Sequence, residues 1–141
     1  MQYVLDANVV VKWFIPEVNS DKADRLLADF RGHRLDIIAP DILVAEVGNT
    51  LWARSVRRKD FSVADAAASY TDFLDLGLPL HSSAAIAEDA LSIATAEQHP
   101  LYDTLYISLA LKRRCEFVTA DESLVNKLGS RFPHIKLLRN L

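Results

Sequence analysis

The feature that most constrains the fold is a regular alternation of short apolar segments with longer segments of helical periodicity. Five short segments have the apolar character of strands: residues 3–5, 35–39, 78–81, 116–119 and 134–138. Seven segments have helical spacing: residues 7–14, 20–31, 41–58, 62–76, 82–97, 102–114 and 121–128. Strands that alternate with helices indicate a parallel sheet with helices on both faces. The pattern therefore predicts an α/β protein.

Polar residues mark several helix starts. Asp41 stands where the helix over residues 41–58 begins and is predicted to cap it. Ser62 and Asp65 form a Ser-x-x-Asp pattern that predicts the start of the next helix, and Ser82 or Ser83 is placed to cap the one after that. The chain of 141 residues has no repeats, low-complexity tracts or linkers. One domain over residues 1–141 is the expectation.

Charge and cysteine content restrict the function classes. The 16 Lys and Arg residues against 19 Asp and Glu residues give a formal charge of −3, which is unlike the basic excess of a dedicated nucleic-acid binder. A net charge hides local clusters, so it does not exclude such binding. The single Cys115 excludes an internal disulfide and a thiolate metal cluster. With no apparent signal peptide and no apolar run long enough for a membrane span, we expect a cytoplasmic protein.

Four acidic residues occupy unusual places in this pattern. Asp6 directly follows the first strand, and Asp121 follows the fourth. Glu46 lies inside the third helix, at the border of its apolar arc, and Asp103 begins a helix whose same face is otherwise apolar. If the first and fourth strands are neighbours, Asp6 and Asp121 emerge at one edge of the sheet. Helices that present Glu46 and Asp103 over that edge would bring four carboxylates together.

Each acid also has a purely structural interpretation. Asp6 and Asp103 could be ordinary helix N-caps. Residues 119–122 could form a capping box between Thr119 and Glu122, which would leave Asp121 without a role. Glu46 could be a solvated helix residue, as most glutamates are. Capping and metal binding do not exclude each other, because a carboxylate has several acceptor lone pairs.

Four converging carboxylates would create a chemical conflict that a metal ion removes. In a partly buried cleft they cannot all stay ionised, because like charges raise one another's pKa values. Carboxylate oxygens are hard ligands that suit Mg²⁺ or Mn²⁺, and the lack of nearby Cys or paired His argues against zinc. Such a site typically activates a water molecule and stabilises charge on a phosphodiester. The acids therefore indicate metal-dependent phosphate chemistry.

Four motifs resemble the PIN domain family, and within it the VapC-type toxin ribonucleases. They are LDANV at residues 5–9, PD at 40–41 with Glu46 and Asn49, YDTLYISLA at 102–110 and FVTAD at 117–121. VKWF at residues 11–14 with Glu17 is also similar to a VapC subgroup. The motifs occur in the family's order over nearly the whole chain. Any one of them is weak, but the ordered set is specific.

The resemblance implies a single PIN-like domain, three-layered α/β/α, with a five-stranded parallel sheet of order 3-2-1-4-5. It implies a Mg²⁺- or Mn²⁺-dependent endoribonuclease that acts as the toxin of a type II toxin–antitoxin system. It also implies a homodimer and a VapB-like antitoxin as partner. The acids it assigns as catalytic residues and metal ligands are Asp6, Glu46, Asp103 and Asp121, and the polar residues that would orient carboxylates or water are Asn8 and Thr119.

Two alternatives to a toxin nuclease stay open: a housekeeping PIN-domain nuclease that processes RNA, and a PIN scaffold that binds without turnover. In the nuclease mechanism, metal-activated water attacks an RNA phosphate in line and leaves a 5′-phosphate and a 3′-hydroxyl. No histidine is needed, so His33, His81, His99 and His134 receive no role. The candidate phosphate contacts, each equally explicable as a solvated helix end, are Lys12, Arg54, Arg57, Arg58, Lys112 and Arg113.

Overall fold

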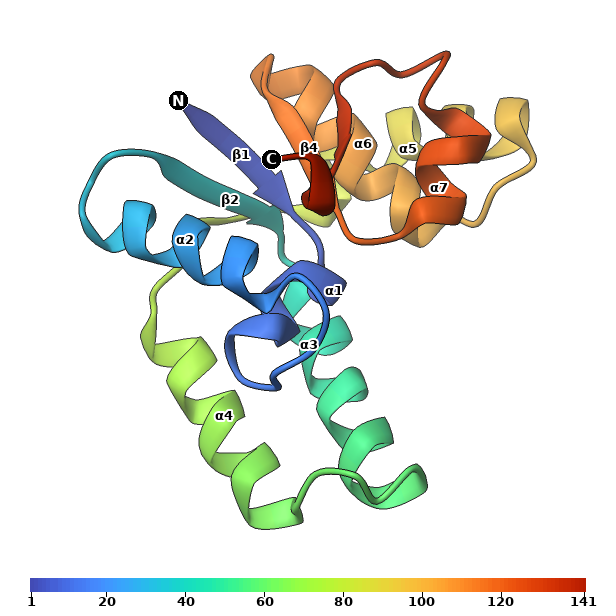
Figure 1. Ribbon diagram of the computed structural model, residues 1–141. Helices are drawn as coiled ribbons and strands as arrows, with labels where there is room; N and C mark the ends of the chain where they lie inside the picture. The colour runs from blue at the N-terminus through green and yellow to red at the C-terminus, as the bar shows by residue number, and fades with distance from the viewer.

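A five-stranded parallel sheet of order β3-β2-β1-β4-β5 forms the centre of the protein, whose computed structural model describes all 141 residues (Figure 1). The strands are β1 (Gln2–Leu5), β2 (Asp36–Pro40), β3 (Leu80–His81), β4 (Glu116–Thr119) and β5 (Ile135–Leu137). Val4 of β1 is in register with Ile38 of β2 and with Phe117 of β4. The predicted strand order is confirmed, and it makes β1 and β4 neighbours.

Helices cover both faces of the sheet and bring the chain back between parallel strands. They are α1 (Ala7–Val10), α2 (Ser20–Arg31), α3 (Leu43–Trp52), α4 (Val63–Asp75), α5 (Ser83–Glu97), α6 (Leu101–Arg113) and α7 (Glu122–Leu128). Figure 1 shows α2 on one side of the sheet and α5 and α6 on the other, while α3 and α4 run side by side beyond its edge. The arrangement is the predicted three-layer α/β/α domain. No helix is long and apolar enough to cross a membrane.

The central strands and α6 are buried on all sides. Successive residues Val4 and Leu5 are both fully buried, as expected for a parallel strand covered on both faces. In α6, every residue from Thr104 to Ala110 is buried, and the ring of Tyr106 stacks on Phe117 of β4 with 5.6 Å between ring centroids. This packing encloses the middle of α6 and leaves only the side chains near its two ends accessible to solvent.

The structure differs from the expected elements at the third helix. Asp41 does not cap it; its Oδ1 accepts a hydrogen bond from the Ser83 backbone N–H at 3.2 Å and so ties the start of α5 to the end of β2. The helix stays regular only to Trp52, and residues Ala53–Arg57 form a π-helical turn closed by the Arg58 N–H to Ala53 carbonyl bond. The caps of α4 and α5 are confirmed, because Ser62 and Ser82 accept hydrogen bonds there.

Candidate active site

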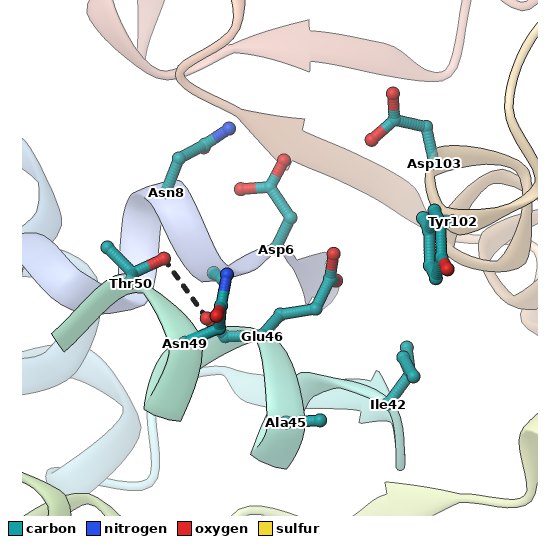
Figure 2. A pocket seen from close by; sticks show the side chains of 10 residues that line it. Asp6, Asn8, Ile42, Ala45, Glu46, Asn49, Thr50, Tyr102 and Asp103 are labelled. Atoms are coloured by element: carbon teal, nitrogen blue, oxygen red, sulfur yellow. Dashed lines mark hydrogen bonds between the residues drawn. The ribbon is translucent and has the colours of Figure 1, made fainter. Parts of the chain in front are cut away.

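An open cavity of about 490 Å³ lies at the carboxyl end of β1, where α1, α3 and α6 meet (Figure 2). Its lining residues are Asp6, Ala7, Asn8, Ile42, Ala45, Glu46, Asn49, Thr50, Tyr102 and Asp103. Figure 2 shows the side chains of Asp6, Glu46 and Asp103 around one shared space. Three of the four predicted acids therefore lie together, at the edge of a parallel sheet where ligands usually bind.

Asp6 is both a helix cap and a buried acid of the cavity. Its Oδ1 accepts a hydrogen bond from the Val9 N–H at 3.3 Å, and its Oδ2 accepts one from the Thr119 hydroxyl at 2.6 Å. The pKa of Asp6 is raised to about 8, chiefly by burial and also by the carboxylates of Asp103 and Glu46, although the hydrogen bonds from Thr119 and Val9 oppose the increase. A buried carboxyl in this state favours a nearby positive charge.

Glu46 faces the cavity from the middle of α3. The Tyr106 hydroxyl donates a hydrogen bond to its Oε1 at 2.5 Å, and Thr50 bonds to its backbone carbonyl at 3.0 Å. Burial and the neighbouring Asp103 raise the pKa of Glu46, against the Tyr106 bond. The pKa of Tyr106 is itself raised by burial and by Glu46, which keeps the phenol protonated as a donor. The predicted half-buried position of Glu46 is confirmed.

Asp103 lies in the first turn of α6 and does not cap it, because the cap position belongs to Pro100. Its Oδ2 is 2.7 Å from Nε2 of His99, whose Nδ1 is 3.0 Å from the Lys127 ammonium. The sequence pattern assigns no role to His99. The spacing of four residues between His99 and Asp103 was the available signal, but Pro100 places His99 in the turn before the helix, where that spacing does not define a common face.

Asp121 lies outside the cavity. It is the N-cap of α7, and its Oδ1 accepts a hydrogen bond from the Leu124 N–H at 3.1 Å. The alternative capping box is wrong, because Thr119 uses its hydroxyl to donate to Asp6 and to accept from the Asp121 N–H at 3.1 Å. No three acidic, histidine or cysteine side chains lie close enough to hold one ion directly. The Asp121 carboxylate therefore caps α7, while the backbone N–H of the same residue bonds to the Thr119 hydroxyl that holds Asp6.

Asn8 joins the ends of β1 and β4 beside the acids. Its Oδ1 accepts a hydrogen bond from the Ala120 N–H at 2.8 Å, which fixes the orientation of the amide. Its Nδ2 lies 3.4 Å from the Thr119 hydroxyl that holds Asp6. Thr119, which the resemblance places beside the last acid, also donates to the first acid, Asp6. Asn8 and Thr119 together connect the loops that follow the two strands.

The basic residues singled out from the sequence do not surround the cavity. Lys12 and Arg54 pair with Glu17 at 3.6 Å and 3.0 Å, and Arg54 also pairs with Asp60 at 2.8 Å. This network ties the 3-10 turn Val11–Trp13, which follows α1, to the π-helical turn that follows α3. The exposed pair at residues 112–113 ends α6, about nine residues and therefore about 14 Å along the helix from Asp103.

Tyr102 is a large exposed side chain on the rim of the cavity that sequence reasoning missed. It is 60% exposed and directly precedes Asp103. In Figure 2 its ring lies between Asp103 and Ile42, across the cavity from Asn49. An exposed aromatic face beside a cluster of acids is suited to stack on a nucleobase. Its exposure depends on the rotation of α6, which the sequence pattern alone does not define.

A parallel sheet of order 3-2-1-4-5, with three acids in a cavity at the carboxyl end of β1, is the arrangement of a PIN-type α/β domain. The PIN domain family model matches residues 3–127, so the chain belongs to the PIN domain family. It is 30% identical over 131 residues to Ribonuclease VapC3 of Pyrobaculum aerophilum, an alignment that covers 90% of this chain and 95% of the relative. The family suggested by the sequence motifs is confirmed.

Solved structures share the fold at lower identity. PAE2754 from Pyrobaculum aerophilum superposes with a TM-score of 0.67 at 20% identity, over 99% of this chain and 94% of its own. VapC20 of Mycobacterium tuberculosis, described as a sarcin-ricin loop cleaving toxin, gives 0.64 at 13% identity over 84% and 87%. VapBC2 from Rickettsia felis, bound to a DNA fragment from its promoter, gives 0.61 at 19% identity over 97% of each chain.

Proposed function

We propose that the chain is a Mg²⁺- or Mn²⁺-dependent endoribonuclease and the toxin of a type II toxin–antitoxin module. The observation that carries the proposal is that Asp6, Glu46 and Asp103, from separate elements, line one open cavity. Burial and a neighbouring carboxylate raise the pKa values of Asp6 and Glu46, and acids perturbed in this way in a cleft are typical of functional sites. The similarity to VapC3, a ribonuclease by name, supports RNA as the substrate.

The donor groups fit a hard divalent cation. Each of the three carboxylates has one oxygen held by a side-chain donor: Thr119 for Asp6, Tyr106 for Glu46 and His99 for Asp103. The second oxygens of Glu46 and Asp103 accept no hydrogen bond from the protein. Mg²⁺ keeps several waters and binds through one or two carboxylates, so it needs no tight cage of three acids. Asp6, Glu46 and Asp103 would hold the ion directly or through its waters.

The chain's own groups orient the reaction. A bound divalent cation would supply a water of lowered pKa and neutralise charge on the phosphodiester. Asp6, Glu46 and Asp103 would hold the ion beside the scissile phosphate, where in-line attack of water would leave a 5′-phosphate and a 3′-hydroxyl. Tyr106 stays protonated and holds Glu46 in place, while Thr119 does the same for Asp6. No histidine is required as a base.

The biological context is proposed by similarity. VapC20 is described as a toxin, and VapBC2 was solved on promoter DNA, which supports a VapB-like antitoxin as the partner of this chain. We also propose a homodimer that acts in the cytoplasm. Asp121 and Asn8 enter the proposal as groups that support the loops beside the acids, and a direct ligand role for Asp121 is tested below.

The test is cleavage of a labelled RNA by the purified protein with Mn²⁺, with EDTA, and with the Asp103→Asn variant. We expect cleavage only with Mn²⁺ and with native Asp103, and products that carry a 5′-phosphate. Equal cleavage by native protein and variant would disprove the catalytic assignment. Induced expression that arrests growth, and its relief by the product of the neighbouring gene, would support the toxin; cleavage without growth arrest would favour an RNA-processing nuclease.

A further inference from the structure

Three side chains from different segments form a continuous hydrogen-bonded series beside the cavity. The Lys127 ammonium, on α7, lies 3.0 Å from Nδ1 of His99 and 3.0 Å from the Gln98 carbonyl oxygen. Nε2 of the same imidazole lies 2.7 Å from Oδ2 of Asp103. The His99 side chain is only 12% exposed, whereas that of Asp103 is 35% exposed. The series therefore runs from the surface of α7 to an acid of the cavity.

The chemistry of the partners determines where the imidazole proton lies. An ammonium has three donors and no acceptor, so Nδ1 of His99 must accept a hydrogen bond from Lys127. The ring proton is then on Nε2, which donates to Oδ2 of Asp103. Lys127 thus selects the tautomer of His99 that can hold the carboxylate. Carboxylates that bind metal ions are commonly held in position by hydrogen bonds from such neighbouring groups.

We propose that His99 and Lys127 are positioning residues that present Asp103 to a divalent cation in the acidic cavity. With Oδ2 held by His99, rotation of the Asp103 side chain is restricted and Oδ1 stays available to the cavity. Neither residue touches the reacting phosphate. The inference rests on the proposed metal-dependent function and deepens it, because it assigns the orientation of one acid to residues on the far side of that acid from the cavity.

A purely structural interpretation predicts something different. Lys127 also bonds to the Gln98 carbonyl, so on this interpretation the series only holds α7 against the turn before α6 and stabilises the fold. Arg131 makes a comparable contact between the segment after α7 and the end of α5. Its Nε donates to Glu97 at 2.6 Å, and its guanidinium donates to the Lys127 carbonyl at 3.3 Å. Arg131 does not contact Asp103. Replacement of Arg131 therefore measures how much such a contact contributes to stability without affecting the orientation of Asp103.

The experiment measures Mn²⁺ affinity by calorimetry on the complete protein without RNA, together with the Mn²⁺ concentration needed for half-maximal RNA cleavage. The variants are His99→Phe, His99→Gln, Lys127→Met, Arg131→Ala and Asp103→Ala. Phe keeps the ring but removes the donor, whereas the Gln amide can still donate to Asp103. The melting temperatures of all variants measure how much the contacts of Lys127 and of Arg131 contribute to stability.

We expect His99→Phe to weaken Mn²⁺ binding about 10-fold or more, as the loss of groups that orient metal ligands typically does. Lys127→Met should weaken Mn²⁺ binding less than His99→Phe does. His99→Gln should keep most of the native affinity, because its amide can still donate to Asp103. Arg131→Ala should lower the melting temperature and leave Mn²⁺ affinity unchanged.

Two outcomes overturn the inference, and they differ in what else they overturn. If native protein binds Mn²⁺ and Asp103→Ala weakens that binding but His99→Phe does not, the inference is wrong while the proposed metal-dependent function stands. The same conclusion follows if His99→Phe and Arg131→Ala change the Mn²⁺ affinity equally. If native protein binds no Mn²⁺, the inference and the proposed metal-dependent function both fail.

Discussion

Replacement of Asp6 by Asn should abolish RNA cleavage and, in metal-free protein, make the fold more stable at alkaline pH. The pKa of Asp6 is raised from 3.8 to about 8, chiefly because the carboxyl is buried. The folded protein therefore binds the Asp6 proton more tightly than the unfolded chain does. The contribution of Asp6 to stability is complete below about pH 3.8 and is lost as pH rises toward 8.

The size of the effect follows from the two pKa values. Each pH step of one between them costs about 1.4 kcal/mol, so metal-free protein at pH 8 has a penalty of at most about 5 kcal/mol from Asp6. Asn removes the buried charge, but the Val9 N–H and the Thr119 hydroxyl bond to different carboxylate oxygens of Asp6. Asn has an acceptor oxygen at only one of these two positions, so one of the donors loses its partner. That mismatch costs about 1–3 kcal/mol. We expect a net gain of about 2–4 kcal/mol at pH 8.

The assay is urea unfolding of EDTA-treated protein at pH 5 and pH 8. The free energy of unfolding of Asp6→Asn relative to native protein should be close to zero or negative at pH 5 and clearly positive at pH 8. Asp24→Asn, at an exposed position of α2, is the control and should show no such trend. Added Mn²⁺ should stabilise native protein more than Asp6→Asn. A stability difference that does not change with pH would refute the reasoning.

Three other predictions separate local from catalytic roles. Asp121→Ala should cost about 1 kcal/mol through loss of the α7 cap, while Asp121→Asn should keep both stability and cleavage; a stable Asp121→Asn variant without cleavage would make Asp121 a ligand after all. Tyr102→Ala should weaken binding of single-stranded RNA by about 1–3 kcal/mol and Tyr102→Phe should not, as measured by fluorescence anisotropy in EDTA; equal affinities would exclude stacking. Arg54→Ala should lower the melting temperature without changing RNA affinity, because Glu17 and Asp60 already engage its side chain; weaker RNA binding by a stable variant would contradict this.

Local chemistry was readable from the sequence because it depends on residues close together in the chain. Strand and helix periodicity predicted the α/β class, and an acid after an apolar strand marked Asp6 as both a cap and a site residue. The same holds for Ser62 and Ser82 at their helix starts. Asp41 is the exception: the Ser83 N–H, 42 residues away in the chain, binds its carboxylate and removes it from the local capping role.

Tertiary packing alone decided which acids share the cavity. Glu46 faces it because the buried ring of Tyr106 on α6 holds its carboxylate, and Asp103 faces it because it lies just before the buried stretch Thr104–Ala110 of α6. Asp121, which the strand-end pattern places beside Asp6, is not among the lining residues of the cavity, and its Oδ1 accepts a hydrogen bond from the Leu124 N–H of α7. Lys127 reaches His99 only when α7 docks beside the turn before α6. A sequence defines which groups a helix carries, but the rotation at which that helix packs decides which of them meet.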